Sequence, residues 1–197
     1  TSRASSATMR TDRTPRWLVS LRPQDWLTLA SASLAFVALL VTLEGRITFA
    51  VALLLMGMLT DMADGVVARA GGDDSAFGRL LDSLVDVPLY LIVPVLVLYE
   101  AGYGQPAGSF GATAFSIAAL ITIAAGLVRL AHFSEHGFVL TESARAYPGL
   151  PVFWLHLVLA LGVAGRFVGG ESATLLLVPV LLSAAALMLR NRPFWKP

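Results

Sequence analysis

Four aspartates are the residues best able to do chemistry in this sequence. Asp61 and Asp64 are three positions apart, and Asp82 and Asp86 are four apart, so on two helices each pair shares a face. A turn at residues 71–74 lets the two helices pack side by side, and the four carboxylates then converge. Four negative charges need compensation in a partly dry environment. Hard divalent cations provide it, and Mg²⁺ or Mn²⁺ held by carboxylates suits reactions of phosphate groups.

Small residues and one arginine accompany the aspartates on the same two stripes. Gly65 and Ala68 follow on the first helix, and Gly78 precedes the acidic pair on the second. Without bulky side chains here, a phosphorylated ligand can approach the backbone closely. Arg69 places a permanent cation beside the expected phosphate position.

A structural or transport role is the alternative for these residues. Acidic side chains within a membrane also form cation pathways or proton relays, and glycine and alanine often only allow helices to pack closely. Several residue types recur here at fixed intervals, which favours a ligand site over a carboxylate-lined cation transporter.

The elements that must position these residues are membrane helices. Of the 197 residues, 56% are hydrophobic and only 14% are charged, where a soluble domain has about 25%. The mean hydropathy is +0.74. Apolar stretches of about 20 residues, each able to cross a ~30 Å hydrocarbon core as a helix, recur along the chain. We predict an all-α integral membrane protein with six transmembrane helices, near residues 26–43, 47–69, 79–100, 110–133, 149–168 and 172–190.

An amphipathic segment precedes the first predicted span. Residues 12–25 mix arginines with tryptophan, leucine and valine, which predicts a short helix lying in the membrane interface. We therefore divide the chain into a cytoplasmic or interfacial segment (1–25), a six-helix domain (26–190) and a cytoplasmic tail (191–197). The absence of cysteine excludes disulfides and thiolate chemistry.

Basic residues predict the orientation of the chain in the membrane. If the N-terminus is cytoplasmic, only Arg46 and Arg166 of the 14 lysines and arginines lie on the outer side. The remaining basic residues then lie on the cytoplasmic side: Arg3, Arg10, Arg13, Arg16, Arg22, Arg69, Arg79, Arg129, Arg145, Arg190, Arg192 and Lys196. This bias indicates an even number of spans, with both termini and the aspartates on the cytoplasmic side.

The aspartate-rich stretch resembles the signature of the CDP-alcohol phosphotransferase family, which is D-x-x-D-G-x-x-A-R, eight residues, then G-x-x-x-D-x-x-x-D. Every specified position is matched, by Asp61, Asp64, Gly65, Ala68, Arg69, Gly78, Asp82 and Asp86. The resemblance implies that an alcohol displaces CMP from a CDP-linked lipid at a site with two divalent cations, Mg²⁺ or Mn²⁺. It implies metal ligation by Asp61, Asp64, Asp82 and Asp86, with Asp86 also the catalytic general base. It implies nucleotide binding by Asp61, Asp64, Gly65, Ala68, Arg69, Gly78 and Asp82.

Three further segments resemble the phosphatidylserine synthase branch of that family. They are "LLDSLVD" at 80–86, "VRLAHF" at 128–133 and "YPGLPV" at 147–152. We therefore expect CDP-diacylglycerol as donor and L-serine as acceptor. Serine carries a carboxylate that an arginine can clamp bidentately, so the predicted acceptor-binding residues are Arg129, Arg145 and Tyr147. Ordinary anchoring at the cytoplasmic surface is the alternative role of the two arginines.

Departures from that branch leave choline open as the acceptor. His132, Ser134 and Trp154 stand where arginine, asparagine and a small residue are usual, and "PLY" at 88–90 replaces Ser-Phe-Gly. A tryptophan three residues after Gly-x-Pro is similar to phosphatidylcholine synthase, although Trp154 is also typical of an interfacial belt. An aromatic cage for choline has candidates in Phe133, Glu142, Tyr147, Phe153 and Trp154.

Acceptors that already carry phosphate, such as inositol phosphate and glycerol phosphate, need several cations around that second phosphate. Residues 134–148 offer only His136 and Arg145, with Arg129 nearby, which disfavours them. From the resemblance we further expect a homodimer. We place it in a prokaryotic cytoplasmic membrane, surrounded by lipid and without a nucleic-acid partner.

Overall fold

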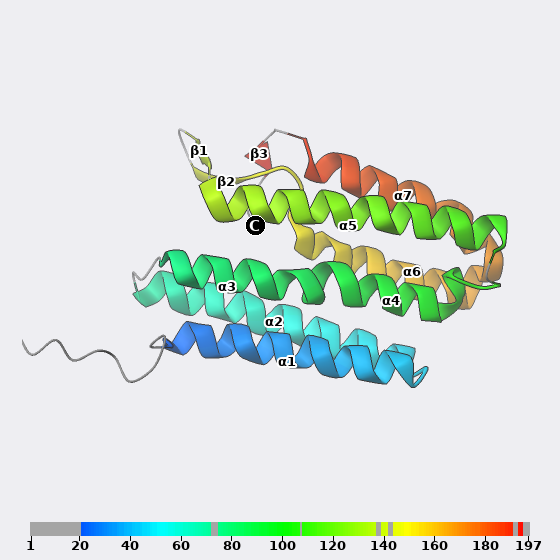
Figure 1. The fold of residues 1–197 in the computed structure, drawn as a ribbon, viewed down its shortest axis with the longest axis horizontal. Helices are drawn as coiled ribbons and strands as arrows, with labels where there is room; N and C mark the ends of the chain where they lie inside the picture. Colours follow the sequence, from blue (N-terminus) through cyan, green and yellow to red (C-terminus); the bar gives the residue numbers. More distant parts are fainter. Residues whose placement is uncertain are drawn as a thin grey trace, which may run out of the picture.

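Long helices that run along one axis make up most of the structure, a computed structural model (Figure 1). It describes residues 21–71, 75–106, 108–136, 139–141, 144–190 and 193–194. The π-helices are η1 and η2, and the 3₁₀ turns are η3 and η4. In chain order the elements are α1 (Pro23–Leu43), α2 (Ile47–Gly71), α3 (Ala76–Asp86), η1 (Val87–Ile92), α4 (Val93–Leu98), η2 (Tyr99–Tyr103), α5 (Phe110–His136), β1 (Val139–Thr141), β2 (Ala144–Pro148), η3 (Val152–Trp154), α6 (Leu155–Gly169), η4 (Gly170–Ser172), α7 (Ala173–Met188) and β3 (Pro193–Phe194).

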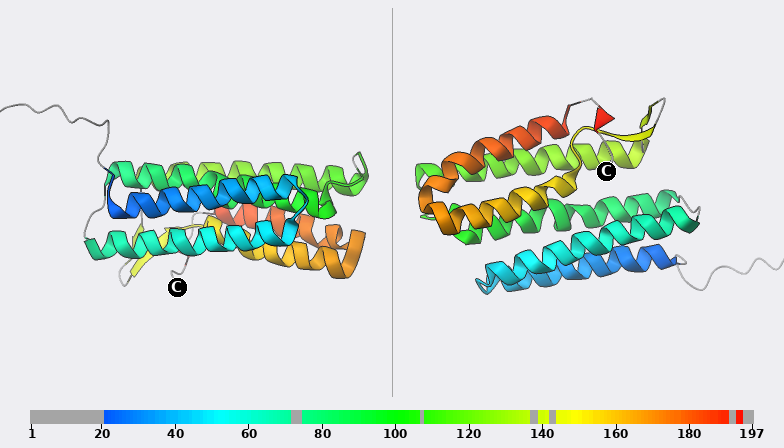
Figure 2. Two further views of the ribbon diagram at one scale, coloured as in Figure 1. Left: turned by 90° about the horizontal axis from the view of Figure 1, so that it is seen from below. Right: turned by 180° about the vertical axis from the view of Figure 1, so that it is seen from behind.

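The helices form an elongated bundle, as all views show (Figures 1 and 2). α1 packs along α2, and α5 packs along α7. α3, η1, α4 and η2 follow one another as a single interrupted helix from Ala76 to Tyr103. One end of the bundle, here called the strand end, holds β1–β3, the start of α1 and the end of α2. The far end holds the α1–α2 turn and the α6–α7 junction.

Apolar side chains both fill the bundle and cover its outside. Leu54, Leu89 and Leu159 are fully buried, whereas Leu161 and Leu175 are largely exposed. A helix that is apolar all round is typical of a membrane span. Within the described residues, five helical segments are long and apolar enough to cross a membrane: Pro23–Leu43, Ile47–Val67, Ala76–Tyr103, Phe110–Glu135 and Val152–Gly169. The chain is therefore an integral membrane protein.

The predicted spans differ from the observed helices in two places. α1 begins at Pro23, so its first turn belongs to the segment assigned to the interface. The sixth apolar helix, α7, has only 16 residues and is shorter than a full span. Residues 1–20, 191–192 and 195–197 lie outside the described residues. Six crossings, the interfacial helix and the domain boundaries at 25 and 190 therefore stay predictions.

The all-α fold class is confirmed, and three short strands accompany the helices in the described part of the chain. β1 pairs antiparallel with β2, and β2 pairs antiparallel with β3. The strands lie beyond the ends of α5 and α7, where the backbone can no longer satisfy its hydrogen bonds within a helix. Pairing with a neighbouring segment meets that need at the strand end of the bundle.

A proline explains why the third span widens directly after Asp86. Pro88 has no N–H to donate, and its ring crowds the carbonyl four residues earlier, so the α-helical ladder cannot continue. The chain forms η1 instead, in which the Val93 N–H donates to the Pro88 carbonyl. Such π segments are frequent at functional sites. This one begins directly after Asp86 and contains Tyr90.

Candidate active site

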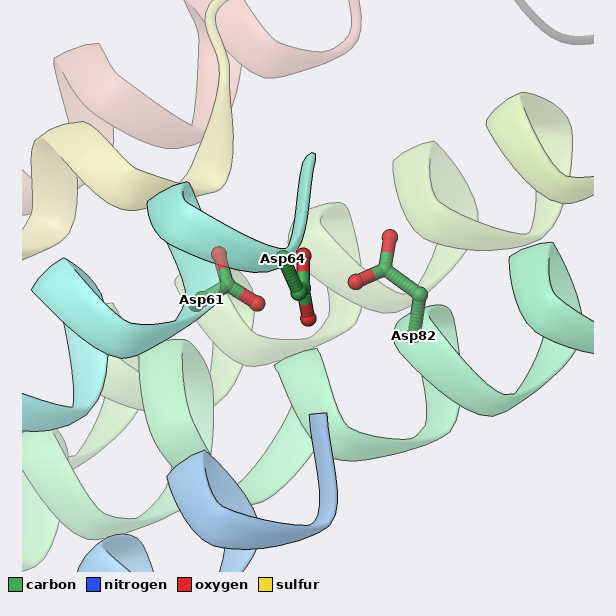
Figure 3. Close-up of side chains that lie close together, drawn as sticks. All are labelled: Asp61, Asp64 and Asp82. Carbon is green, nitrogen blue, oxygen red and sulfur yellow. The ribbon is translucent and has the colours of Figure 1, made fainter. Parts of the chain in front are cut away.

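Three aspartates from two helices meet inside the bundle. α2 supplies Asp61 and Asp64, and α3 supplies Asp82. Each offers a carboxylate oxygen, and these three oxygens all lie within 4.8 Å of one another. Figure 3 shows Asp64 between the other two. Asp64 is buried and its two neighbours are half-buried. These three residues are called the aspartate cluster below.

Hydroxyl groups from two other parts of the chain hold the aspartate cluster. Thr28 of α1 donates its Oγ1–H to Oδ2 of Asp64 at 2.6 Å. Tyr90 of η1 donates its O–H to Oδ2 of Asp61 at 2.8 Å. The second oxygen of Asp61 is buried, and no hydrogen bond reaches it from the described residues. One buried acceptor atom of the cluster is therefore left for a ligand to satisfy.

This donor set fits a metal ion. Three carboxylates that have lost most of their water repel one another unless a cation lies between them. Oxygen atoms at this spacing are the ligands that hard divalent cations take. The buried, unpartnered Oδ1 of Asp61 is the atom that such an ion would satisfy. The aspartate cluster could thus bind a metal ion.

Asp86 lies one turn beyond Asp82, at the last residue of α3. The group of three converging oxygens does not include it. It is nevertheless close enough to interact electrostatically with Asp82, Asp61 and Arg129. Asp86 therefore lies in the electrostatic surroundings of both the cluster and the Arg129 guanidinium.

Arg129 of α5 is buried, with 6% of its surface exposed. A hydrogen bond between two serines ties its helix to α3, since Ser134 donates its hydroxyl to Ser83 Oγ at 2.6 Å. Ser83 is itself buried and precedes Asp86 by three positions. This contact joins α5, which holds the predicted acceptor-binding Arg129, to α3, which ends at Asp86.

The small residues of the motif lie on the same two helices. Gly65 of α2 is half-buried. The Gly78 N–H donates to Ser75 Oγ at 3.0 Å, which caps the start of α3. A Cβ at Gly78 would come within 3.0 Å of that oxygen and 3.7 Å of Asp25 Oδ1, so this corner is tightly packed. Ala68 and Arg69 lie in the last turns of α2, but their side chains fall outside the description.

The other predicted acceptor residues are placed less completely. Arg145 and Tyr147 belong to β2 at the strand end, and their side chains are not described. Of the candidate choline cage, Phe153 and Trp154 stack with ring centroids 5.8 Å apart. Glu142 lies outside the described residues.

Thr28 and Tyr90 are site residues that the motif did not reveal. Asp25, Thr28 and Ser31 recur at intervals of three on α1, and all three are buried. That polar stripe in an otherwise apolar span was a signal for the first of them. The sequence signal for Tyr90 is weaker: it is a tyrosine well inside a span rather than at the interfacial ends of one. His156 of α6 packs edge-on against the Tyr90 ring, with centroids 4.8 Å apart, and so fixes its position.

Comparison with known proteins agrees with this geometry. Residues 24–189 match the CDP-alcohol phosphatidyltransferase family. Archaetidylserine synthase of Methanothermobacter thermautotrophicus is 29% identical over 169 residues, which cover 85% of this chain and 66% of that protein. Phosphatidylcholine synthase of Mesorhizobium japonicum is 28% identical over 178 residues, which cover 85% of this chain and 62% of that protein.

A second serine-directed relative matches a shorter stretch. CDP-diacylglycerol–serine O-phosphatidyltransferase of Methanocaldococcus jannaschii is 31% identical over 100 residues, which cover 51% of this chain and 43% of that protein. The chain thus spans less than two thirds of the length of these curated relatives. The family match, in contrast, runs through all the described helices. The chain belongs to the CDP-alcohol phosphatidyltransferase family.

Proposed function

We propose that the chain transfers the phosphatidyl group of CDP-diacylglycerol to the hydroxyl of L-serine, releasing CMP and forming phosphatidylserine. The aspartate cluster carries the proposal, because it gathers three carboxylates within 4.8 Å in a membrane bundle of this family. The names of two relatives, archaetidylserine synthase and CDP-diacylglycerol–serine O-phosphatidyltransferase, support serine as the acceptor. A lipid donor also accounts for a polar site inside a bundle, since its acyl chains can stay in the bilayer.

In this proposal the aspartates hold two divalent cations, Mg²⁺ or Mn²⁺. The ligands would be Asp61, Asp64 and Asp82, with Asp86 completing the set. Bound there, the cations would neutralise the pyrophosphate and stabilise the departing CMP. Thr28 and Tyr90 each occupy one carboxylate oxygen and so orient the remaining oxygens toward the ligand. Gly65, Ala68, Arg69 and Gly78 would line the nucleotide side.

Asp86 is the proposed catalytic base. It would take the proton of the serine hydroxyl as that oxygen attacks phosphorus and the bond from phosphorus to the CMP oxygen breaks. Arg129, which interacts electrostatically with Asp86, would bind the serine carboxylate. Serine carries both groups that this arrangement needs, a hydroxyl for Asp86 and a carboxylate for Arg129. Arg145 and Tyr147 are the further acceptor-binding candidates.

Choline is the second candidate acceptor. The similarity to phosphatidylcholine synthase supports it, and so does the stacked pair of Phe153 and Trp154 beside the start of α6. A quaternary ammonium would bind against such rings rather than to an arginine. Alcohol phosphates remain weaker alternatives for want of basic residues. A cation transporter would use the same carboxylates without releasing CMP.

The orientation and assembly complete the proposal. The basic residues at the strand end, among them Arg22 and Arg190, support a cytoplasmic location of the aspartates and of both termini. We also expect a homodimer in a prokaryotic cytoplasmic membrane.

A competition assay tests the acceptor. Purified protein receives CDP-diacylglycerol, Mn²⁺ or Mg²⁺, and equal amounts of serine, choline, inositol phosphate and glycerol phosphate, and the lipid product is identified by mass. Phosphatidylserine is the expected product. A choline lipid would transfer the assignment to the second candidate, and metal-dependent cation flux without CMP would favour the transporter.

Asp86→Asn tests the base. We expect CMP release to fall about 100-fold or more, because a general base contributes on that order. Glu44→Gln, an acid-to-amide change in the exposed α1–α2 turn, is the matched control and should keep full activity. Undiminished turnover in the Asp86 variant would remove Asp86 from that role.

Arg129→Gln tests the acceptor site. If Arg129 binds the serine carboxylate, KM for serine should rise about 10-fold or more while KM for CDP-diacylglycerol changes little. Arg190→Gln, an exposed arginine at the strand end, is the control. Equal KM values for serine in the two variants would contradict the assignment.

A further inference from the structure

A second polar site lies at the far end of the bundle, away from the aspartate cluster. A cavity of about 480 Å³ opens there between three segments. Its walls are the α1–α2 turn with the start of α2 (residues 45–49), Glu100 and Ala101 of η2, and the last turns of α6. A volume of this size accommodates a small ligand or a lipid headgroup.

This cavity is lined by the two basic residues that do not lie on the predicted cytoplasmic side. Arg46 and Arg166 are the two arginines expected on the outer side, and both lie in its wall. Anchoring of cytoplasmic loops explains the other basic residues but not these two. Their meeting in one cavity therefore needs another reason, and an anionic ligand supplies it.

The Arg166 side chain packs against residues of η2. Its guanidinium lies over the Tyr103 ring at 5.7 Å. The Tyr103 hydroxyl is fixed in turn, because it donates to the Gly162 carbonyl at 2.9 Å. A Cβ on Gly102, where φ is +108°, would come within 2.8 Å of Arg166 Nε, so only glycine leaves this place open. Within the described residues no carboxylate lies at ion-pair distance from Arg166.

Arg46 faces the cavity from the turn. Its guanidinium lies over the Phe49 ring at 4.8 Å. Among the described residues it pairs with the Glu44 carboxylate at 3.9 Å, and both side chains are more than half exposed, so this pair is weak. Arg46 is therefore able to turn toward a stronger anionic partner.

We propose that this cavity binds the headgroup of a zwitterionic aminophospholipid from the leaflet opposite the aspartate cluster. The two guanidinium groups match the oxygens of its phosphodiester. Glu100, in the same wall, would repel a purely anionic headgroup but matches an ammonium group. Phe167, which is 75% exposed, offers an apolar surface for the acyl chains toward the bilayer. The site is independent of the proposed transfer reaction.

Lipid titration tests the proposal without measuring catalysis. Delipidated protein in detergent is titrated with phosphatidylethanolamine, phosphatidylglycerol or inorganic phosphate, and binding is read by native mass spectrometry and by the unfolding temperature. Phosphatidylethanolamine should bind most tightly. Arg166→Gln and Arg46→Gln should each weaken its binding at least about tenfold, because each removes charge-assisted hydrogen bonds.

Two comparisons decide the result. Arg190→Gln, at the opposite end of the bundle, should bind phosphatidylethanolamine as the unchanged protein does, and Glu100→Gln should abolish the preference over phosphatidylglycerol. Should Arg166→Gln not fold, Arg46→Gln in the exposed turn gives the answer alone. Unchanged lipid binding in the arginine variants, or inorganic phosphate binding as tightly as the lipid, would overturn the proposal.

Discussion

Tyr90→Phe tests whether the aspartate cluster depends on groups outside the family motif. The change removes one hydroxyl, which donates to Asp61 Oδ2 at 2.8 Å. It leaves the ring that packs against His156, with centroids 4.8 Å apart. Because the other oxygen of Asp61 has no partner among the described residues, the variant would leave this carboxylate unheld.

The expected effect follows from the strength of that bond. A hydrogen bond to a charged group contributes about 1.5–3 kcal/mol. Loss of such an outer contact to a metal ligand lowers metal affinity about 10–100-fold. We therefore expect Tyr90→Phe to weaken Mn²⁺ binding by that factor and to raise the Mn²⁺ concentration needed for CMP release.

Mn²⁺ binding is measured on the purified protein by electron paramagnetic resonance, independently of turnover. Tyr99→Phe is the matched control, since Tyr99 lies in η2 toward the far end of the bundle. The unfolding temperature of both variants is compared first, so that a loss of fold is recognised. A Tyr90→Phe protein that is folded and binds Mn²⁺ as tightly as the Tyr99 variant would refute the role given to Tyr90.

Two further changes separate site effects from fold effects. Thr28→Val should also lower Mn²⁺ affinity about 10-fold, because it removes the 2.6 Å bond to Asp64. Thr42→Val, which loses only a bond to its own helix, should leave Mn²⁺ affinity unchanged. Equal Mn²⁺ affinities in the two threonine variants would contradict the prediction. Gly149→Ala should destabilise the protein by about 1–3 kcal/mol, since φ is +70° and a Cβ would lie 2.5 Å from the Met188 carbonyl. The midpoint temperature of thermal unfolding should be lower for Gly149→Ala than for Gly108→Ala, where φ is +80° and the space is open. Identical midpoints in the two variants would argue against the clash.

The sequence predicts which residues share a face of one helix, but it does not predict which faces of different helices meet. Intervals of three and four placed the aspartates on faces of two neighbouring helices, and three of them do converge. The same intervals contain no information on which face of α1 or η1 turns toward them. Thr28 is 36 positions from Asp64 along the chain, so only the packed bundle reveals that contact.

Asp86 is the motif aspartate whose distance from the others the spacing could not give. A spacing of four from Asp82 predicts a shared face, and the three converging oxygens come from Asp61, Asp64 and Asp82. Asp86 is the last residue before the helix widens at Pro88, and beyond that point an α-helical interval no longer describes the backbone. Strands β1 and β3 were equally beyond prediction, because two or three residues are too few for a pattern.

The hydrogen bonds of buried polar residues distinguish the site from the rest of the bundle. Thr42 donates to the carbonyl four residues earlier in its own helix, and Thr122 does so too while also reaching Leu181 of α7. Such bonds, all to backbone carbonyls, satisfy a hydroxyl inside a membrane without any ligand. Thr28 also makes the bond within its helix, to Gln24, but its second bond crosses to an aspartate side chain. Polar side chains are costly inside a membrane, and they usually pair with one another or with backbone carbonyls. A hydroxyl that donates to a carboxylate of another helix, as Thr28 does, therefore marks the functional site rather than a purely structural contact.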